Sequence, residues 1–135
     1  MNLGLPLVAL AALAAGGAAA ADSRHRLECP PQAPAEWGGA RGSLVGVDVL
    51  SARRGEAIDE SAPPSLVPDA QQSRAGTLHQ TWRMNADGPE WVFHVWCRYA
   101  GSTRVLKLAA SGVRQCERVL SAAHPDRPPQ QMFCD

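Results

Sequence analysis

Apolar and polar residues alternate with a period of two in several short stretches of the chain, a pattern typical of half-buried β-strands. In the first stretch, Val45, Val47 and Val49 fall on one face. No long stretch repeats apolar residues at the helical period of 3.6, and residues 52–62 have room for one short helix at most. The stretches predicted to form strands are residues 44–51, 77–84, 91–99, 104–109 and 114–120. The pattern predicts a mainly β protein.

Turn residues between the second and third stretches predict a hairpin. Residues 85–89 read Asn-Ala-Asp-Gly-Pro, a combination that breaks regular structure and reverses the chain. We expect Met84 opposite Trp91, because this register keeps the apolar residues of both strands on one face. The same register puts Trp82 opposite Phe93. A slip of one residue would mix the two faces, so burial selects this pairing.

A second hairpin is predicted by Gly101-Ser102, because glycine readily takes the positive φ that a type II′ turn requires. That turn sets Cys97 opposite Leu106, again apolar against apolar. The two hairpins together predict a three-stranded antiparallel meander. Segments 52–76 and 121–135 contain several prolines and are expected to form loops. We therefore expect a small single domain, an antiparallel meander or sandwich with long Pro-rich loops.

The first 21 residues carry no charged side chain and end in the run Gly-Gly-Ala-Ala-Ala-Ala. An apolar run followed by small residues is typical of a cleavable secretory signal. We expect cleavage after Ala20 or Ala21, which leaves residues 22–135 as one domain in the periplasm or outside the cell. An uncleaved membrane anchor is the rival interpretation, since the run is nominally long enough to span a bilayer. The Ala/Gly-rich composition favours cleavage, after which we expect no membrane association.

Four cysteines lie in the expected mature domain: Cys29, Cys97, Cys116 and Cys134. An even number of cysteines in a short exported chain indicates two disulfides. A zinc site is disfavoured, because no two cysteines are spaced as closely as in C-x-x-C. Four cysteines allow three pairings, and the sequence alone does not choose among them. Our preference is Cys29–Cys134 with Cys97–Cys116, which would join the termini and staple the sheet separately.

The formal net charge is zero, with 13 basic and 13 acidic residues. There is no positive excess to displace counterions from phosphate, so a nucleic-acid partner is disfavoured. No G-x-S-x-G motif indicates a serine hydrolase, and the neighbouring carboxylates Asp59 and Glu60 fall in a loop with nothing to raise a pKa. We therefore predict no enzymatic activity, no catalytic residues and no cofactor. The oligomeric state stays open.

One face of the predicted sheet collects polar and aromatic side chains. His79 and His94 lie within reach of each other there, but no third ligand joins them, so a polar face covered by a loop is favoured over a metal site. Large aromatics mixed with arginine on a surface are typical of interface hot spots. Residues 22–43 are rich in proline and glycine and predict an irregular N-terminal arm. Packing of this arm or of the 52–76 loop over Trp96 is the favoured alternative to an open face. The candidate partner-binding residues are Arg83, His94, Trp96 and Arg98.

Several sequence features resemble a family of short, exported, four-cysteine proteobacterial proteins that is largely uncharacterised. They are Cys29-Pro30, Ser-Leu-Val-Pro-Asp at 65–69, Trp82, Trp-Cys-Arg-Tyr-Ala-Gly-Ser-Thr at 96–103, Cys116 and Cys134. The resemblance spans most of residues 27–135. Some members lie near type VI secretion genes, which implies a periplasmic immunity protein that guards against a cell-wall-degrading toxin. The Cys-x-Tyr strand is also similar to small periplasmic lysozyme inhibitors.

Together these features predict a periplasmic or secreted binding or inhibitor protein, with a secreted effector or an envelope enzyme as its partner. Immunity to a cell-wall-targeting toxin is the form that the resemblance implies. The alternative is a structural or stress-related cell-envelope protein with no single tight partner.

Overall fold

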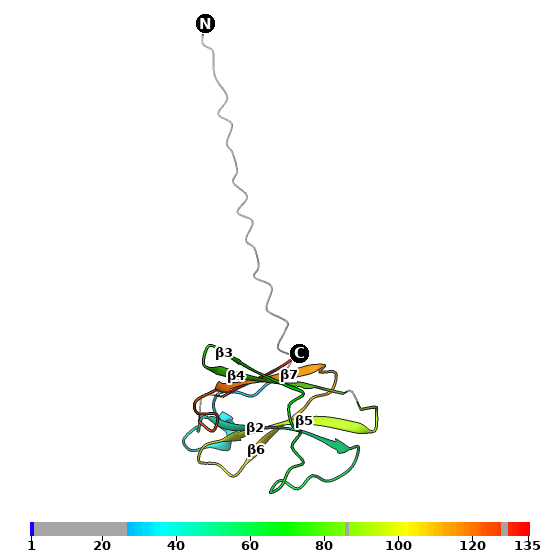
Figure 1. Ribbon diagram of the computed structural model, residues 1–135. Coiled ribbons are helices and arrows are strands. Elements are labelled where there is room, and N and C mark those ends of the chain that lie inside the picture. Colours follow the sequence, from blue (N-terminus) through cyan, green and yellow to red (C-terminus); the bar gives the residue numbers. More distant parts are fainter. Residues whose placement is uncertain (2–26, 86, 128–129) are drawn as a thin grey trace.

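The computed structural model describes residues 1, 27–85, 87–127 and 130–135 (Figure 1). The predicted signal segment, apart from Met1, lies outside the described residues. Within the described part, no helix has the length and apolar character needed to cross a bilayer. The elements are β1 (Leu27–Glu28), η1 (Ala35–Trp37), β2 (Leu44–Arg53), β3 (Ala70–Arg74), β4 (Thr77–Arg83), β5 (Trp91–Tyr99), β6 (Val105–Ala109), β7 (Gln115–Ser121) and β8 (Gln131–Cys134).

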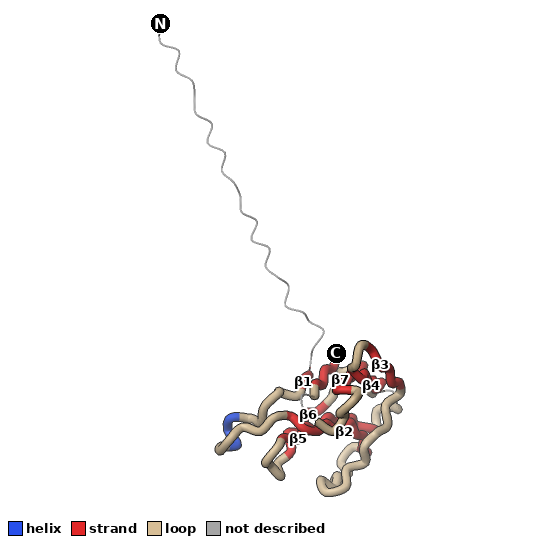
Figure 2. Tube along the Cα trace, turned by 60° about the vertical axis from the view of Figure 1, so that its left-hand side comes forward, coloured by secondary structure: helices blue, strands red, loops and turns tan. Residues whose placement is uncertain are grey.

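The strands form two antiparallel sheets that pack face to face as a sandwich (Figure 1). One sheet has five strands in the order β1-β8-β7-β4-β3, and the other has three in the order β2-β5-β6. The short 3-10 helix η1 projects at one end of the molecule, where it is coloured blue in Figure 2. The expectation of a mainly β domain is confirmed, and of its two forms the sandwich is the one observed.

The core lies between the two sheets and is built from the inward-facing side chains of both. Trp82 on β4 and Met132 on β8 come from the larger sheet, and Val49, Phe93 and Val95 come from the smaller one. Alternation along each strand brings these side chains to the inner faces, where burial of their apolar surface holds the sheets together.

The predicted hairpin between residues 77–84 and 91–99 is wrong. Both stretches are strands, but β4 pairs with β3 and β7, whereas β5 pairs with β2 and β6. The connection turns out of the sheet at Asn85, whose φ is +57°. Its side-chain amide donates hydrogen bonds to the carbonyls of Ala110 (3.0 Å) and Val113 (2.5 Å). Period-two alternation is the same for two paired strands and for two strands facing each other across a sandwich, so the pattern could not separate them.

The predicted register between β5 and β6 is confirmed, with Cys97 opposite Leu106. The turn itself differs from the expected type II′ turn. Gly101 has a φ of +72°, but the amide of Ser102 donates to the carbonyl of Tyr99 (3.3 Å). Gly101 is therefore the third residue of a four-residue turn, and β6 begins one residue later than expected, at Val105.

Strand β2 carries an irregularity near its start that changes the predicted core face. Val47 and Val49 are buried as expected, but the register shifts between Leu44 and Gly46. Because of this bulge, Leu44 enters the core and Val45 does not. The strand also continues to Arg53, which shortens the expected 52–76 loop to residues 54–69.

Strands β3 and β8 were not expected from the sequence. Strand β3 is entirely exposed and polar, so it lacks the alternation that indicates a strand. It forms a two-residue hairpin with β4 through Ala75 and Gly76, both with positive φ. Strand β8 pairs with β7 and fixes the Pro-rich C-terminal segment to the larger sheet.

Two disulfides are present, but the preferred pairing is wrong: the bonds are Cys29–Cys97 and Cys116–Cys134. Cys97 lies on β5 and Cys116 on β7, in different sheets, so the expected staple within one sheet cannot form. Cys116 lies directly opposite Cys134 in the β7–β8 pair, with Cα atoms 4.1 Å apart. The Cα atoms of Cys29 and Cys97 are 5.8 Å apart, within the range that a disulfide spans.

Candidate functional site

The four candidate partner-binding residues do not share one face. Three of them lie at alternating positions of β5, on the face of the three-stranded sheet that points away from the core: His94, Trp96 and Arg98. Arg83 is an exposed residue at the end of β4, in the other sheet. His79 also lies on β4 and is therefore separated from His94, so the expected proximity of the two histidines is wrong.

Trp96 is covered by the 54–69 loop, with 2% of its surface exposed. Its two neighbours across the sheet are Asp48 on β2 and Lys107 on β6. The loop binds both: Ser65 Oγ donates to Asp48 (3.1 Å), and Glu60 forms an ion pair with Lys107. A loop that is held on both sides of Trp96 must pass over it, which confirms the alternative favoured from the sequence.

Charged side chains fix the loop over this face. Arg98 forms an ion pair with Asp48 (2.7 Å) and donates to the carbonyl of Glu60 (3.5 Å). The Lys107 ammonium lies 5.0 Å from the centre of the Trp96 ring, within cation–π distance. His94 lies opposite the buried Leu50. Burial lowers the pKa of His94, so the neutral imidazole is favoured. The residues of this face thus hold the loop in place.

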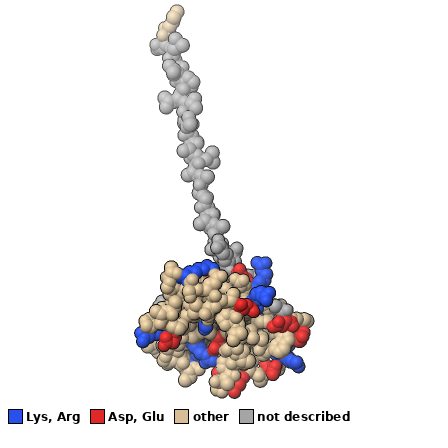
Figure 3. Space-filling view, viewed as in Figure 1, with Lys and Arg blue, Asp and Glu red and all other residues tan. Residues whose placement is uncertain are grey.

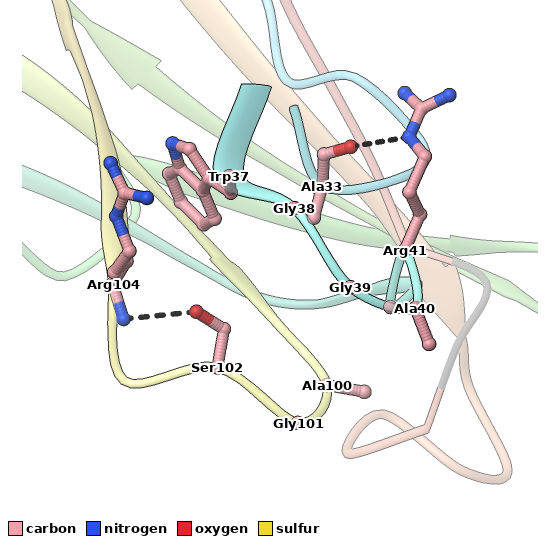
Figure 4. A pocket seen from close by; sticks show the side chains of 11 residues that line it. Ala33, Trp37, Gly38, Gly39, Ala40, Arg41, Ala100, Gly101, Ser102 and Arg104 are labelled. Carbon is pink, nitrogen blue, oxygen red and sulfur yellow. Dashed lines mark hydrogen bonds between the residues drawn. The ribbon is translucent and has the colours of Figure 1, made fainter. Parts of the chain in front are cut away.

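An open cleft of about 540 Å³ lies between the N-terminal arm and the β5–β6 turn (Figure 4). Segment 38–42 forms one side, and segment 100–104 forms the other. Figure 4 shows the Arg104 side chain beside the ring of Trp37, and its guanidinium carbon is 4.8 Å from the ring centre. Gly42 approaches the turn so closely that a Cβ atom there would lie 1.9 Å from the carbonyl oxygen of Ala100. This position therefore requires glycine.

Tyr99, the last residue of β5, holds the N-terminal arm against the β5–β6 turn. Its hydroxyl donates to the carbonyl of Pro30 (2.9 Å), and its ring packs edge-on against Trp37 at 5.8 Å. The Cys29–Cys97 disulfide ties the same two segments together, one residue before Pro30 and two before Tyr99. The arm that the sequence indicated as irregular is thus held against β5 by a covalent bond and a hydrogen bond.

Positive charge dominates the lining of this cleft. Arg104 and Arg41 both line it, and no carboxylate does. The Nε of Arg41 donates to the carbonyl of Ala33 (2.8 Å), which holds that side chain on the arm. The pair of a half-buried tryptophan, Trp37, and an exposed arginine, Arg104, has the composition that binding hot spots favour. Elsewhere the signs mix: on the face seen in Figure 3, basic and acidic side chains are interspersed.

The outer face of the five-stranded sheet holds a hydrogen-bonded line of carboxylate, imidazole and hydroxyl. Glu117 lies 2.6 Å from Nδ1 of His79, and Thr77 Oγ1 lies 3.0 Å from its Nε2. The Thr77 hydroxyl donates to the carbonyl of Arg74 (2.7 Å), so its proton is not directed at the imidazole. The line orients His79 without presenting an activated nucleophile. No group of three potential metal ligands occurs among the described residues.

No protein-family model, curated protein or solved structure matches this chain. Trp37 and Arg104 were not predicted from the sequence as site residues. The arm carries no periodic pattern, and we did not predict the Cys29–Cys97 disulfide that brings the arm to β5. The aromatic residue followed by two glycines at 37–39 was the available signal for an exposed loop.

Proposed function

We propose that this protein is an exported binding protein that inhibits another protein, as an immunity protein does for a cell-wall-targeting toxin. The two disulfides, with no free cysteine, fit an oxidising compartment outside the cytoplasm. The observation that carries the proposal is the cleft between the arm and the β5–β6 turn, with its stacked Trp37–Arg104 pair.

Rigidity of the cleft supports a binding role. Binding costs free energy when loops must become ordered, and a cleft whose walls are already fixed avoids most of that cost. The Cys29–Cys97 disulfide and the Tyr99 hydroxyl fix both walls here. Two arginines and no carboxylate in the lining favour an acidic surface on the partner.

The test uses the secreted effector encoded beside this gene, if the neighbourhood holds an amidase, muramidase or lipase toxin. We expect the purified effector to bind the oxidised protein, and Arg104→Glu to weaken binding by roughly 100-fold in an equilibrium binding measurement. Arg104 is exposed, so this charge reversal leaves folding intact.

Arg74→Glu provides the matched control, because Arg74 is exposed on β3 in the other sheet. Equal losses for both variants would indicate a general charge effect and would contradict a role for the cleft. Absence of any binding would favour the structural or stress-related envelope protein instead.

A further inference from the structure

The side chain of Val67 is exposed to solvent, although the loop residues on both sides of it are hydrogen-bonded to the two sheets. It is 85% exposed, and apart from Met1 it is the one large hydrophobic side chain exposed in the described part of the chain. Among the other larger apolar residues of the loop, Pro64 is exposed, and four are partly buried: Ile58, Pro63, Leu66 and Pro68. A single exposed aliphatic side chain is ordinary on a protein surface. What distinguishes Val67 is that the chain is hydrogen-bonded to the body of the molecule on both sides of it.

The residues before Val67 are bound to the three-stranded sheet. Ser65 forms a β-bridge with Leu50, and the amide of Leu66 donates to the carbonyl of Val49 (2.7 Å). The carbonyl of Leu66 in turn accepts a hydrogen bond from the indole of Trp82 (3.0 Å). Both main-chain groups of Leu66 therefore point into the molecule.

The residues after Val67 are bound to the five-stranded sheet. The amide of Asp69 donates to the carbonyl of Thr81 (2.8 Å), and its carboxylate accepts from the amide of Arg83 (2.6 Å). Val67 is thus suspended between anchors on both sheets. No described residue forms a hydrogen bond with the amide or the carbonyl of Val67. In an extended chain the main-chain groups of neighbouring residues point in opposite directions, so those of Val67 point away from the molecule, toward solvent.

Proline restricts the segment further. Pro68 directly follows Val67, and a residue before proline is confined to extended conformations. Little conformational entropy remains to be lost when such a segment binds. The segment therefore offers an extended main chain with free hydrogen-bonding groups and one aliphatic side chain, which is what the substrate cleft of an endopeptidase recognises.

We propose that Val67 enters the side-chain pocket of an endopeptidase that accepts small aliphatic residues, with segment 65–69 lying in the substrate cleft as an uncleaved, non-covalent inhibitor. This inference rests on the proposed inhibitor function and adds a second partner, an endopeptidase, to the cell-wall-targeting effector. It uses a surface different from the Trp37–Arg104 cleft, so the two can fail independently.

The test measures inhibition of elastase, whose primary pocket takes small aliphatic side chains, and of trypsin, whose pocket takes arginine. We expect the oxidised protein to inhibit elastase competitively and to leave trypsin unaffected. Val67→Ala should raise the inhibition constant about 10-fold, because two methyl groups leave the pocket. Val67→Asp should raise it at least about 100-fold, because a carboxylate would be buried there.

Val67→Arg should transfer inhibition from elastase to trypsin, an outcome that a nonspecific surface effect cannot produce. Ala57→Asp is the matched control, since Ala57 is an exposed residue of the same loop and its substitution should change nothing. Failure of the unaltered protein to inhibit elastase, or equal inhibition by Val67→Asp, would overturn the inference. Binding of the neighbouring effector by Val67→Asp would show that the proposed function stands even so.

Discussion

Tyr99 is the single tyrosine of the chain and lies where the N-terminal arm meets β5. It is 2% exposed, and its hydroxyl donates to the carbonyl of Pro30. Burial raises the pKa of Tyr99 to about 12, from an ordinary value of 10.0, because the phenolate would have to form away from water. A group this close to the cleft reports on whether the arm is docked.

Titration of the single tyrosine follows directly from this geometry. We expect the ultraviolet absorbance of phenolate to rise with a midpoint near pH 12 in the folded protein and near 10 in denaturant. Because the folded pKa is the higher one, the contribution of Tyr99 to the free energy of unfolding should be constant below pH 10 and fall as the pH rises from 10 towards 12. Tyr99→Phe should remove that part of the pH dependence. A folded-state midpoint near 10 would contradict docking of the arm.

Individual side chains on the inner faces were only partly predictable from the sequence. Arg118 lies between the sheets, where it donates to Gln80 and to the carbonyl of Val47 (3.0 Å). Burial lowers the pKa of Arg118, and the charge of Asp48 opposes that shift. A half-buried arginine between two sheets is not indicated by a hydrophobic pattern, because the partners that make its burial tolerable come from distant parts of the chain.

The β3–β4 hairpin is the element with the clearest local strain. Ala75 has a φ of +47° and Gly76 a φ of +80° in the two-residue turn. Such a turn favours Asn-Gly, because asparagine tolerates the left-handed region and alanine does so at a cost. The turn therefore stores free energy that a single substitution can release.

Ala75→Asn should raise the free energy of unfolding by about 0.5–1 kcal/mol in chemical denaturation, because it relieves the left-handed strain. Ala75→Val should lower it, since a β-branched residue is disfavoured at positive φ. Ala57→Asn, at an exposed position of the 54–69 loop, is the control and should change stability little. Equal effects of Asn and Val at position 75 would argue against this turn conformation.

The positions of the strands along the chain were predicted better than the pairing of the strands within the sheets. Period-two alternation located the core strands β2, β4 and β5, because each has one buried face. The turn at Gly101-Ser102 located β6, and β7 was expected around Cys116, after the break at Ser111-Gly112. Assigning strands to sheets needed the connection at Asn85, whose side-chain hydrogen bonds to Ala110 and Val113 involve residues 25 and 28 positions away. Burial of Trp96 under the loop likewise depends on Glu60 and Ser65, which are far from it in sequence.

At the scale of the whole molecule, the two disulfides act on different parts of the sandwich. Cys29–Cys97 joins the arm to the three-stranded sheet, and Cys116–Cys134 joins the C-terminal strand to the five-stranded sheet. Their sequence separations of 68 and 18 correspond to about 4 and about 3 kcal/mol of loop-closure entropy removed from the unfolded chain. Together they are comparable to the net stability of a domain of this size.

The pairing of the cysteines decides whether the two-sheet arrangement, and with it the position of the cleft and the Val67 loop, is correct. Proteolysis of the unreduced exported protein followed by mass spectrometry measures it directly. We expect peptides linked only as Cys29–Cys97 and Cys116–Cys134, which collapse to their components on reduction. A Cys97–Cys116 linkage, or four free thiols, would contradict the sandwich and the function built on it.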